Sequence, residues 1–118
     1  MPYTRGEIVL VAFPNSDLRT AKLRPALVVQ ATDLNTQLPQ TVVAMITSNL
    51  SRVGHPSRIV ARVGSPEGRE SGLLTDSVVM TDNLSTILDQ AITRVIGFWK
   101  NMTVIDRALI HTLGLDVE

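Results

Sequence analysis

Six short segments rich in valine, isoleucine and other apolar residues, separated by polar turns, constrain the fold of this chain more than any other feature. Runs of this length and composition are typical of strands with at least one buried face. The C-terminal pattern differs, because apolar side chains at 105, 108, 109 and 113 have helical spacing. The sequence therefore predicts a mainly β fold, a small antiparallel barrel with one helix packed on it. The predicted strands are 7–13, 25–31, 41–50, 57–64, a segment around 77–81, and 91–99 with or without a short helical lead-in.

Two polar segments between the strands predict loops. Pro14 opens the polar segment 14–24, which has the composition of a loop. Pro25 suits the first residue of the next strand, where the sheet needs no backbone donor. The segment SPEGRESG at 65–72 is rich in turn-forming residues and predicts a second loop.

The C-terminal helix carries boundary signals at both ends. Thr103 is followed three positions later by Asp106, which predicts a capping box at the N-terminal end of the helix. Gly114 follows the last apolar turn, where a glycine commonly ends a helix in the left-handed conformation.

Length and composition predict one cytoplasmic domain. The 118 residues, 44% of them apolar, fit a single domain, 1–118, with one modest core. The chain has no cysteine, which excludes disulfides and thiolate chemistry and suits a reducing cytoplasm. No secretory signal is visible, and no apolar stretch approaches the roughly 20 residues that span a bilayer, so we expect no membrane partner. His55 and His111 stand alone in the sequence, so no metal or other cofactor is predicted.

The two halves of the chain have opposite charge although the net charge is zero. Residues 1–62 hold seven basic and three acidic residues, and 63–118 hold four basic and eight acidic residues. Nine of the eleven basic residues are arginine, whose planar fork suits bidentate contacts with phosphate. The charge pattern by itself favours a simpler interpretation, in which the two halves pair with each other in the fold.

Two short motifs are candidates for chemistry. Arg24 directly precedes the second predicted strand, and Thr47, Ser48 and Asn49 end the third. Adjacent strands would place both motifs at one rim, where a permanent cation beside hydroxyl donors could stabilise charge on a reacting phosphate. Both motifs also have a structural interpretation, since Thr-Ser-Asn commonly ends a strand and an arginine before a strand is commonly solvated. The residues alone leave the two interpretations open.

The order of several motifs resembles the PemK/MazF family of toxin endoribonucleases. These motifs are RGEIVLVAFP, LRPALVVQ after a polar loop, TVVAMITS, LLTDSVVMTDNLSTI and the C-terminal AITRVIGFWKNMTVIDRALIHTLGL. The resemblance covers nearly the whole chain, and the joint order is more specific than any single motif. It implies an SH3-like antiparallel barrel, a two-fold homodimer, and a toxin inhibited by a cognate antitoxin protein.

The resemblance also implies a reaction and assigns residues to it. Family members cut single-stranded RNA, including mRNA, without a metal, when the ribose 2′-oxygen attacks the adjacent phosphate to leave a 2′,3′-cyclic phosphate and a 5′-hydroxyl. The family's catalytic arginine corresponds to Arg24 in Arg24-Pro25, and its catalytic hydroxyl to Thr47, with Ser48 in support. Because arginine stays protonated in proteins, stabilisation of phosphate charge is the role expected of Arg24, with protonation of the leaving 5′-oxygen as a further possibility.

Further RNA contacts are implied with less support from the residues. Asp82 and Asn83 match a family strand whose side chains face RNA bases, although they could simply begin a turn. Arg19 and Lys22 lie where the family grips its substrate, and Asn49 follows the catalytic hydroxyl. The loop NSDLRTAKL lacks the glycines that family members often carry before the Arg-Pro motif, so its substrate preference is open.

Two other functions are compatible with the same resemblance. One is a non-enzymatic toxin of this fold that binds DNA gyrase. The other is a catalytically degenerate barrel that binds RNA without cutting it. Retention of Arg24 and Thr47 favours the nuclease, because a pure binder needs no stabiliser of developing phosphate charge at that position.

Overall fold

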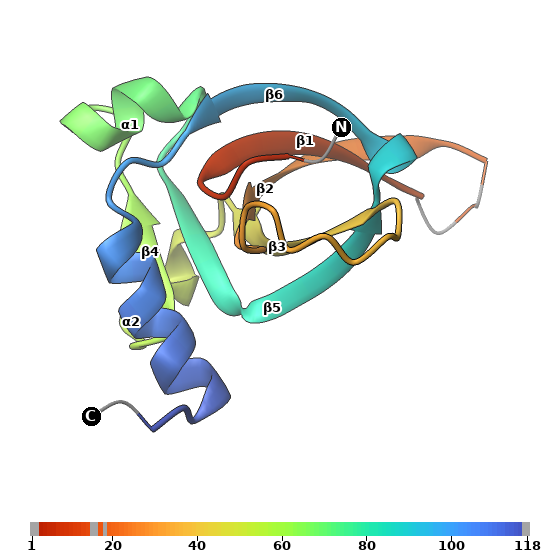
Figure 1. The fold of residues 1–118 in the computed structure, drawn as a ribbon. Coiled ribbons are helices and arrows are strands. Elements are labelled where there is room, and N and C mark those ends of the chain that lie inside the picture. The colour runs from red at the N-terminus through yellow and green to blue at the C-terminus, as the bar shows by residue number, and fades with distance from the viewer. Residues whose placement is uncertain (1–2, 15–16, 18, 117–118) are drawn as a thin grey trace.

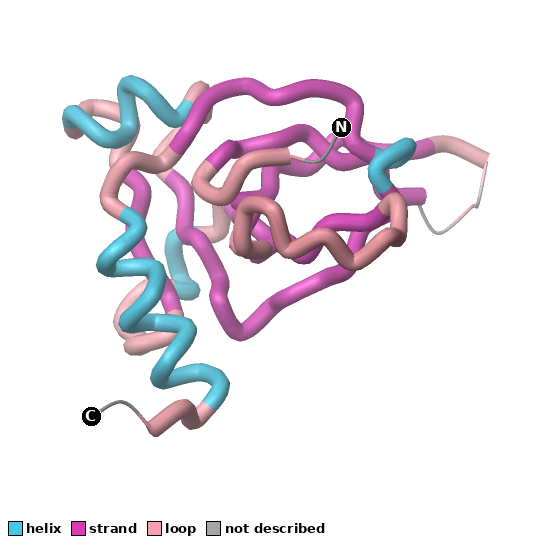
Figure 2. The backbone as a smooth tube through the Cα atoms, viewed as in Figure 1, coloured by secondary structure: helices cyan, strands magenta, loops and turns pink. Residues whose placement is uncertain are grey.

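Six antiparallel strands form one curled sheet in the computed structural model of the chain, which describes residues 3–14, 17 and 19–116. The strand order is β4–β5–β3–β2–β1–β6, and the sheet bends round on itself while α2 packs against one side (Figures 1 and 2). The strands are β1 (Glu7–Pro14), β2 (Ala21–Val28), β3 (Gln40–Thr47), β4 (Arg58–Ala61), β5 (Ser77–Leu88) and β6 (Ile92–Phe98). The helices are α1 (Pro66–Ser71) and α2 (Met102–Leu113), with 3-10 turns η1 (Leu50–Arg52) and η2 (Asp89–Ala91).

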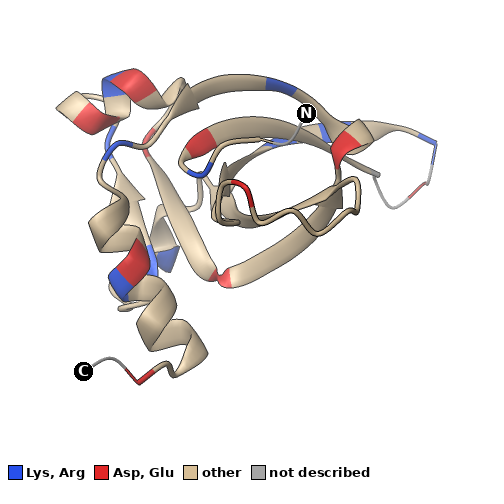
Figure 3. Cartoon of the chain, viewed as in Figure 1, with Lys and Arg blue, Asp and Glu red and all other residues tan. Residues whose placement is uncertain are grey.

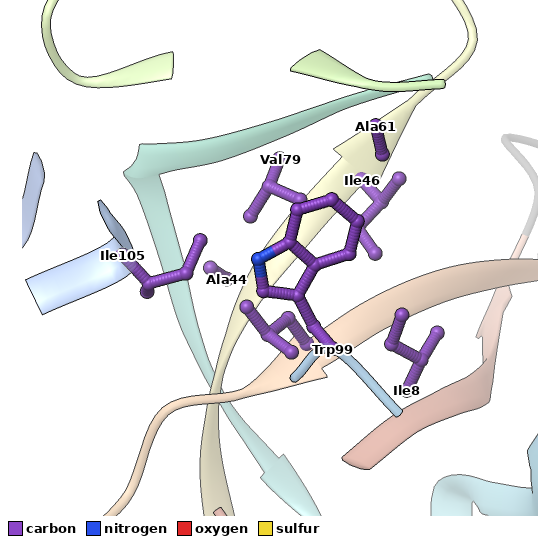
Figure 4. Close-up of a cluster of buried hydrophobic side chains, with 8 residues drawn as sticks. Ile8, Ala44, Ile46, Ala61, Val79, Trp99 and Ile105 are labelled. Atoms are coloured by element: carbon purple, nitrogen blue, oxygen red, sulfur yellow. The ribbon is translucent and has the colours of Figure 1, made fainter. Parts of the chain in front are cut away.

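The central strands are buried on both faces. Successive residues of β1 enter different cores, since Ile8 belongs to a cluster with Trp99 and Ile105 of α2 whereas Val9 belongs to a second cluster whose buried members all come from strands. Strands covered on both sides need apolar residues at consecutive positions rather than at alternate ones, which explains the unbroken run IVLVAF. The close-up in Figure 4 shows Trp99 surrounded by side chains from the sheet and from Ile105 of α2.

The predicted C-terminal helix is confirmed, but its predicted capping box is wrong. The helix begins at Met102 after Asn101, so Thr103 already lies inside its first turn. Asp106 instead forms an ion pair with Arg5, at 2.5 Å between Nη2 and Oδ1. Gly114 ends the helix with φ 66° and donates its backbone N–H to the carbonyl of His111, as its position predicted.

The second strand begins four residues earlier than the sequence predicted. β1 and β2 remain paired as far as Pro14↔Ala21, so the predicted loop 14–24 is shorter and Arg24 lies within β2. Pro25 is also internal to the strand, but β3 pairs with β2 only over Ala26–Val28. A proline is tolerated there because only one neighbouring strand is present at that point.

The segment predicted as the loop 65–72 contains the helix α1, so this prediction is wrong. Ser65 caps the helix by accepting the backbone N–H of Gly68 at 3.0 Å, Pro66 occupies the first turn, and Gly72 ends it with φ 75°. Serine before proline and a glycine at the end are ordinary helix boundary signals. The composition concealed them because the helix has only six residues.

Charge pairing joins the two halves of the chain, as the simpler interpretation of the sequence predicted. Three ion pairs are present among the described residues: Arg5–Asp106, Arg58–Asp82 and Arg62–Asp76. Each one joins a basic residue from 1–62 to an acidic residue from 63–118. The cartoon in Figure 3 shows basic and acidic residues interspersed along the chain. No helix in the described part of the chain is long and apolar enough to cross a membrane.

Candidate active site

Two grooves meet at Arg24 and Thr47, which line both of them. The Arg94 groove, with a volume of about 440 Å³, runs over β2, β1 and β6 and is closed on one side by the segment that follows α1. The Asn83 groove, with a volume of about 420 Å³, lies over β3 and the middle of β5. The polar residues and cations of the Arg94 groove include Lys22, Arg24, Thr47, Ser48, Thr75 and Arg94. Those of the Asn83 groove include Arg24, Thr47, Asn49, Arg52, Asn83 and Ser85.

The charge that lines both grooves is positive. Lys22, Arg24 and Arg94 line one groove, and Arg24 and Arg52 line the other, while no aspartate or glutamate is among the described lining residues of either. Within the described part of the chain, the side chains of these four cations make no ion pair or hydrogen bond. A protein of zero net charge thus keeps unpaired cations beside its grooves, which suits an anionic ligand.

The Thr47 hydroxyl is fixed at the end of β3 with its proton available. Its Oγ1 accepts the backbone N–H of Asn49 at 3.1 Å, so the O–H remains free to donate to a ligand. Asn49 also has a structural role, because its Oδ1 accepts the backbone N–H of Ser51 at 3.1 Å and caps η1. The Asn49 side chain therefore has its amide hydrogens left for a ligand.

Asp82 and Asn83, which are adjacent in the sequence, lie at an irregularity in β5. Met80 pairs with Met45 and Leu84 pairs with Ala44, so residues 81–83 have no partner on β3, and β5 bends sharply along its length (Figure 1). Such bulges redirect side chains. The alternative that these residues begin a turn is not observed, because both lie within β5.

Asn83 lines its groove, whereas Asp82 lies outside both grooves and bonds to Arg58. The Asp82 carboxylate accepts Nη2 of Arg58 at 2.7 Å and Nε at 3.4 Å. The hydrogen bond from this guanidinium holds the pKa of Asp82 below its ordinary value. Arg58 also donates Nη1 to the carbonyl of Arg52 at 3.3 Å, so the pair is bonded to a lining residue of the Asn83 groove.

Arg19 also lies outside both grooves among the described residues. Its backbone N–H donates to Oδ1 of Asp17 at 2.9 Å, and this bond, with one from Thr20, lowers the pKa of Asp17. Residues 15, 16 and 18 of the predicted substrate loop lie outside the described part of the chain.

Two parts of the site gave no signal in the sequence. Arg94 and Arg52 are lining cations whose sequence context gave no signal beyond their charge. The segment Gly72–Thr75 forms a wall of the Arg94 groove, and Leu74 there is 95% exposed. Its position depends on α1, which the sequence prediction had treated as a loop.

The two histidines lie together, and neither is a lining residue of a groove. The rings of His55 and His111 make an edge-to-face contact with their centroids 5.9 Å apart. Neither histidine lines the Arg94 groove or the Asn83 groove. Within the described residues, no group of three or more histidine, cysteine, aspartate or glutamate side chains could hold a metal ion.

Comparisons with known proteins identify one family and one fold. Residues 4–113 match the family described as PemK-like, MazF-like toxin of type II toxin–antitoxin systems. No curated protein sequence matches the chain. A solved endoribonuclease in complex with its cognate antitoxin, from a mycobacterial species, is 20% identical over 99% of this chain and 100% of its own, with a TM-score of 0.78.

Two further solved structures have the same architecture. The toxin MazF-mt6 of Mycobacterium tuberculosis is 24% identical over 94% of this chain and 99% of its own, with a TM-score of 0.73. The MazF of a MazE–MazF crystal structure from Deinococcus radiodurans is 18% identical over 97% of both chains, with a TM-score of 0.70. These likenesses confirm the predicted mainly β fold with its C-terminal helix.

Proposed function

Because the chain belongs to the family of PemK-like, MazF-like toxins of type II toxin–antitoxin systems, we propose that it is a metal-independent endoribonuclease. Its substrate is single-stranded RNA, cut at a preferred short sequence. One observation carries this proposal: Arg24 and Thr47 lie where two cationic grooves meet. An RNA strand that occupies both grooves would place one of its phosphates between these two residues.

The proposed reaction is an attack by the ribose 2′-oxygen on the adjacent phosphorus. The bond from the 2′-oxygen to phosphorus forms, the bond from phosphorus to the 5′-oxygen breaks, and the products end in a 2′,3′-cyclic phosphate and a 5′-hydroxyl. Extra negative charge develops on the non-bridging oxygens, and Arg24 with the free O–H of Thr47 complements it. Each such donor is worth about 10² to 10³ in rate in well-studied enzymes.

Proton transfer in this scheme uses solvent or phosphate oxygens on the nucleophile side. The described lining residues of both grooves include no histidine or carboxylate, so no conventional general base is at hand. The 2′-hydroxyl loses its proton to water or to a phosphate oxygen, and the leaving 5′-oxygen takes one from water or from Arg24. DNA lacks the 2′-hydroxyl and is therefore not a substrate.

The proposal includes two protein partners and a location. A cognate antitoxin would inhibit this chain, and solved relatives crystallised with an antitoxin support that part of the proposal. A homodimer and a cytoplasmic location follow from the family alone. The remaining proposed RNA contacts are Lys22, Ser48, Asn49 and Asn83, which line the grooves.

Cleavage of a long single-stranded RNA in EDTA, with matched DNA in parallel and the product ends mapped, tests the proposal. We expect cuts at a recurrent short motif, 5′-hydroxyl and cyclic phosphate ends, and intact DNA. RNA that stays intact under excess protein would overturn the nuclease proposal. A gyrase inhibition assay and an RNA binding assay would then separate the gyrase-binding toxin from the degenerate barrel.

A further inference from the structure

Arg94 lines the Arg94 groove, and its position in the sheet is near that of the candidate catalytic residue Arg24. Leu10 of β1 pairs with Pro25 on one side and with Arg94 on the other. Pro25 and Arg94 therefore lie on one line across three strands, with their backbones roughly 10 Å apart at two strand spacings. Arg24 directly precedes Pro25 in β2. Both arginines line the Arg94 groove.

A bulge in β6 lies directly beside this arginine. Leu10 pairs with Arg94 and the next residue, Val11, pairs with Ile92, so Thr93 is an extra residue on β6. Thr93 donates its hydroxyl to the carbonyl of Leu10 at 3.2 Å, which ties the bulge to β1. Bulges of this kind often redirect a neighbouring side chain beside a functional site.

The surroundings of Arg94 favour a bound anion. Arg94 is exposed and makes no ion pair or hydrogen bond with the described residues. Leu10, Leu73 and Ile96 supply apolar surface in the same groove, and no carboxylate lines it among the described residues. Charge–charge attraction is stronger beside apolar surface than in open water, so a phosphate would be held there without competition from the protein's own acids.

We propose that Arg94 is a positioning residue that binds a phosphate of the RNA strand next to the one at Arg24. The inference rests on the proposed nuclease function and deepens it, because it gives the path of the RNA across β2, β1 and β6. Arg94 takes no part in bond breaking. The contact between Arg94 and the neighbouring phosphate aligns the RNA so that the scissile phosphate lies between Arg24 and Thr47.

Arg94→Gln tests the proposal against Arg107→Gln, which changes an exposed arginine of α2 outside both grooves. We expect KM for a cleavable RNA to rise roughly tenfold, as for loss of one charged contact, with kcat changed far less. Binding is measured with an RNA that carries a 2′-deoxy nucleotide at the cut site and so cannot be cleaved. The slope of log affinity against log salt concentration is negative, and in Arg94→Gln its magnitude should be smaller than in the wild type by about 0.7.

A charge-neutral methylphosphonate, scanned along the same uncleavable RNA, identifies the phosphate. One linkage beside the cut site should weaken binding to the wild type and to Arg107→Gln but not to Arg94→Gln. Arg94→Lys should restore part of the salt slope, because it restores the charge. Thr93→Val should raise KM by a smaller factor than Arg94→Gln, while Thr93→Ser keeps the hydroxyl and behaves like wild type.

Two failures are distinguishable in these assays. If the wild type cuts RNA but Arg94→Gln matches Arg107→Gln in KM, salt slope and methylphosphonate scan, the role of Arg94 is wrong and the nuclease proposal stands. If the wild type neither cuts nor binds RNA, the proposed function itself is wrong. A fall in kcat with unchanged KM in Arg94→Gln would also contradict a positioning role.

Discussion

Arginine is used in opposite ways in the grooves and around the paired strands β4 and β5. Arg58, which begins β4, and Arg62, which follows it, are each bonded to a carboxylate, at 2.7 Å and 3.3 Å. In the grooves, Arg24 and Arg94 have no such partner among the described residues. A paired arginine has its charge neutralised and serves the fold, whereas an unpaired one beside a groove remains available to a ligand.

The difference is informative because the two kinds of arginine cannot be told apart by sequence. Arg58 follows a turn and opens a strand, a context similar to the one predicted for Arg24. The carboxylate that neutralises Arg58 comes from position 82, on a neighbouring strand. Of the four predictions below, three test what a charged or titratable residue does with or without a partner, and one tests the packing that forms a wall of the Arg94 groove.

The largest expected effect is on catalysis, in Arg24→Gln. Loss of the guanidinium removes the stabilisation of phosphate charge, so the single-turnover cleavage rate should fall about 10²- to 10³-fold. The free energy of unfolding should change by less than about 0.5 kcal/mol, because the Arg24 side chain makes no ion pair or hydrogen bond with the described residues. Urea unfolding and rapid-quench cleavage measure the two quantities. A large loss of stability would show that Arg24 serves the fold, and the contrast between the two regions would not hold.

Gly97→Ala should destabilise the fold and displace one wall of the Arg94 groove. A Cβ at Gly97 would lie 2.3 Å from the carbonyl carbon of Ser71 and 2.4 Å from the carbonyl oxygen of Glu70, so α1 must move away from β6. We expect a loss of about 1–3 kcal/mol, as for overpacking elsewhere, and a higher KM for RNA.

The control for this change is Gly64→Ala. A Cβ at Gly64 meets nothing within 4 Å, so its stability and KM should match those of the wild type. Equal melting temperatures for Gly97→Ala and the wild type would contradict the close contact between α1 and β6.

The Arg58–Asp82 pair should contribute modestly to stability and only above a low pH. Its side chains are 24% and 29% exposed, and pairs near the surface contribute about 0.2–1 kcal/mol. Because the folded-state pKa of Asp82 is lowered, the contribution is complete above the ordinary carboxyl pKa near 4 and is lost as pH falls below it through the folded-state value.

Urea unfolding of wild type and Asp82→Asn at pH 5 and pH 3 checks this prediction. The difference in unfolding free energy should be smaller at pH 3 than at pH 5. A difference that grows from pH 5 to pH 3 would have the wrong sign for a carboxylate that is stabilised in its charged form.

The smallest expected effect is on the pH dependence of cleavage, in His55→Gln and His111→Gln. The two rings contact each other and line neither groove. Cleavage rates measured between pH 5.5 and 8 should therefore follow the wild-type profile in both variants. A limb of the profile that disappears in either variant would identify a histidine as an acid or base and contradict the proposed route of the protons.

Much of the fold could be predicted because its signals are local. Strands such as IVLVAF have the composition of strands wherever they pack, and α2 has its apolar spacing and the glycine at its end. Two errors occurred where a partner elsewhere in the chain decides the outcome, and a third, α1, was concealed because the helix has only six residues. β2 begins at Ala21 because β1 continues to pair with it, and Asp106 bonds to Arg5, 101 positions away, rather than capping its own helix.

The candidate site divides in the same way. The chemistry available at Arg24 and Thr47 could be inferred from the residue types, and the family resemblance connected that chemistry to RNA. The three-dimensional arrangement was needed to show that these two residues lie at the junction of two grooves, that Asn83 lines a groove while Asp82 bonds to Arg58, and that Arg94 lies across β1 from Pro25. It could not be predicted because charge pairing and groove formation depend on which strands are neighbours, and sheet order is set by contacts between residues far apart in the chain.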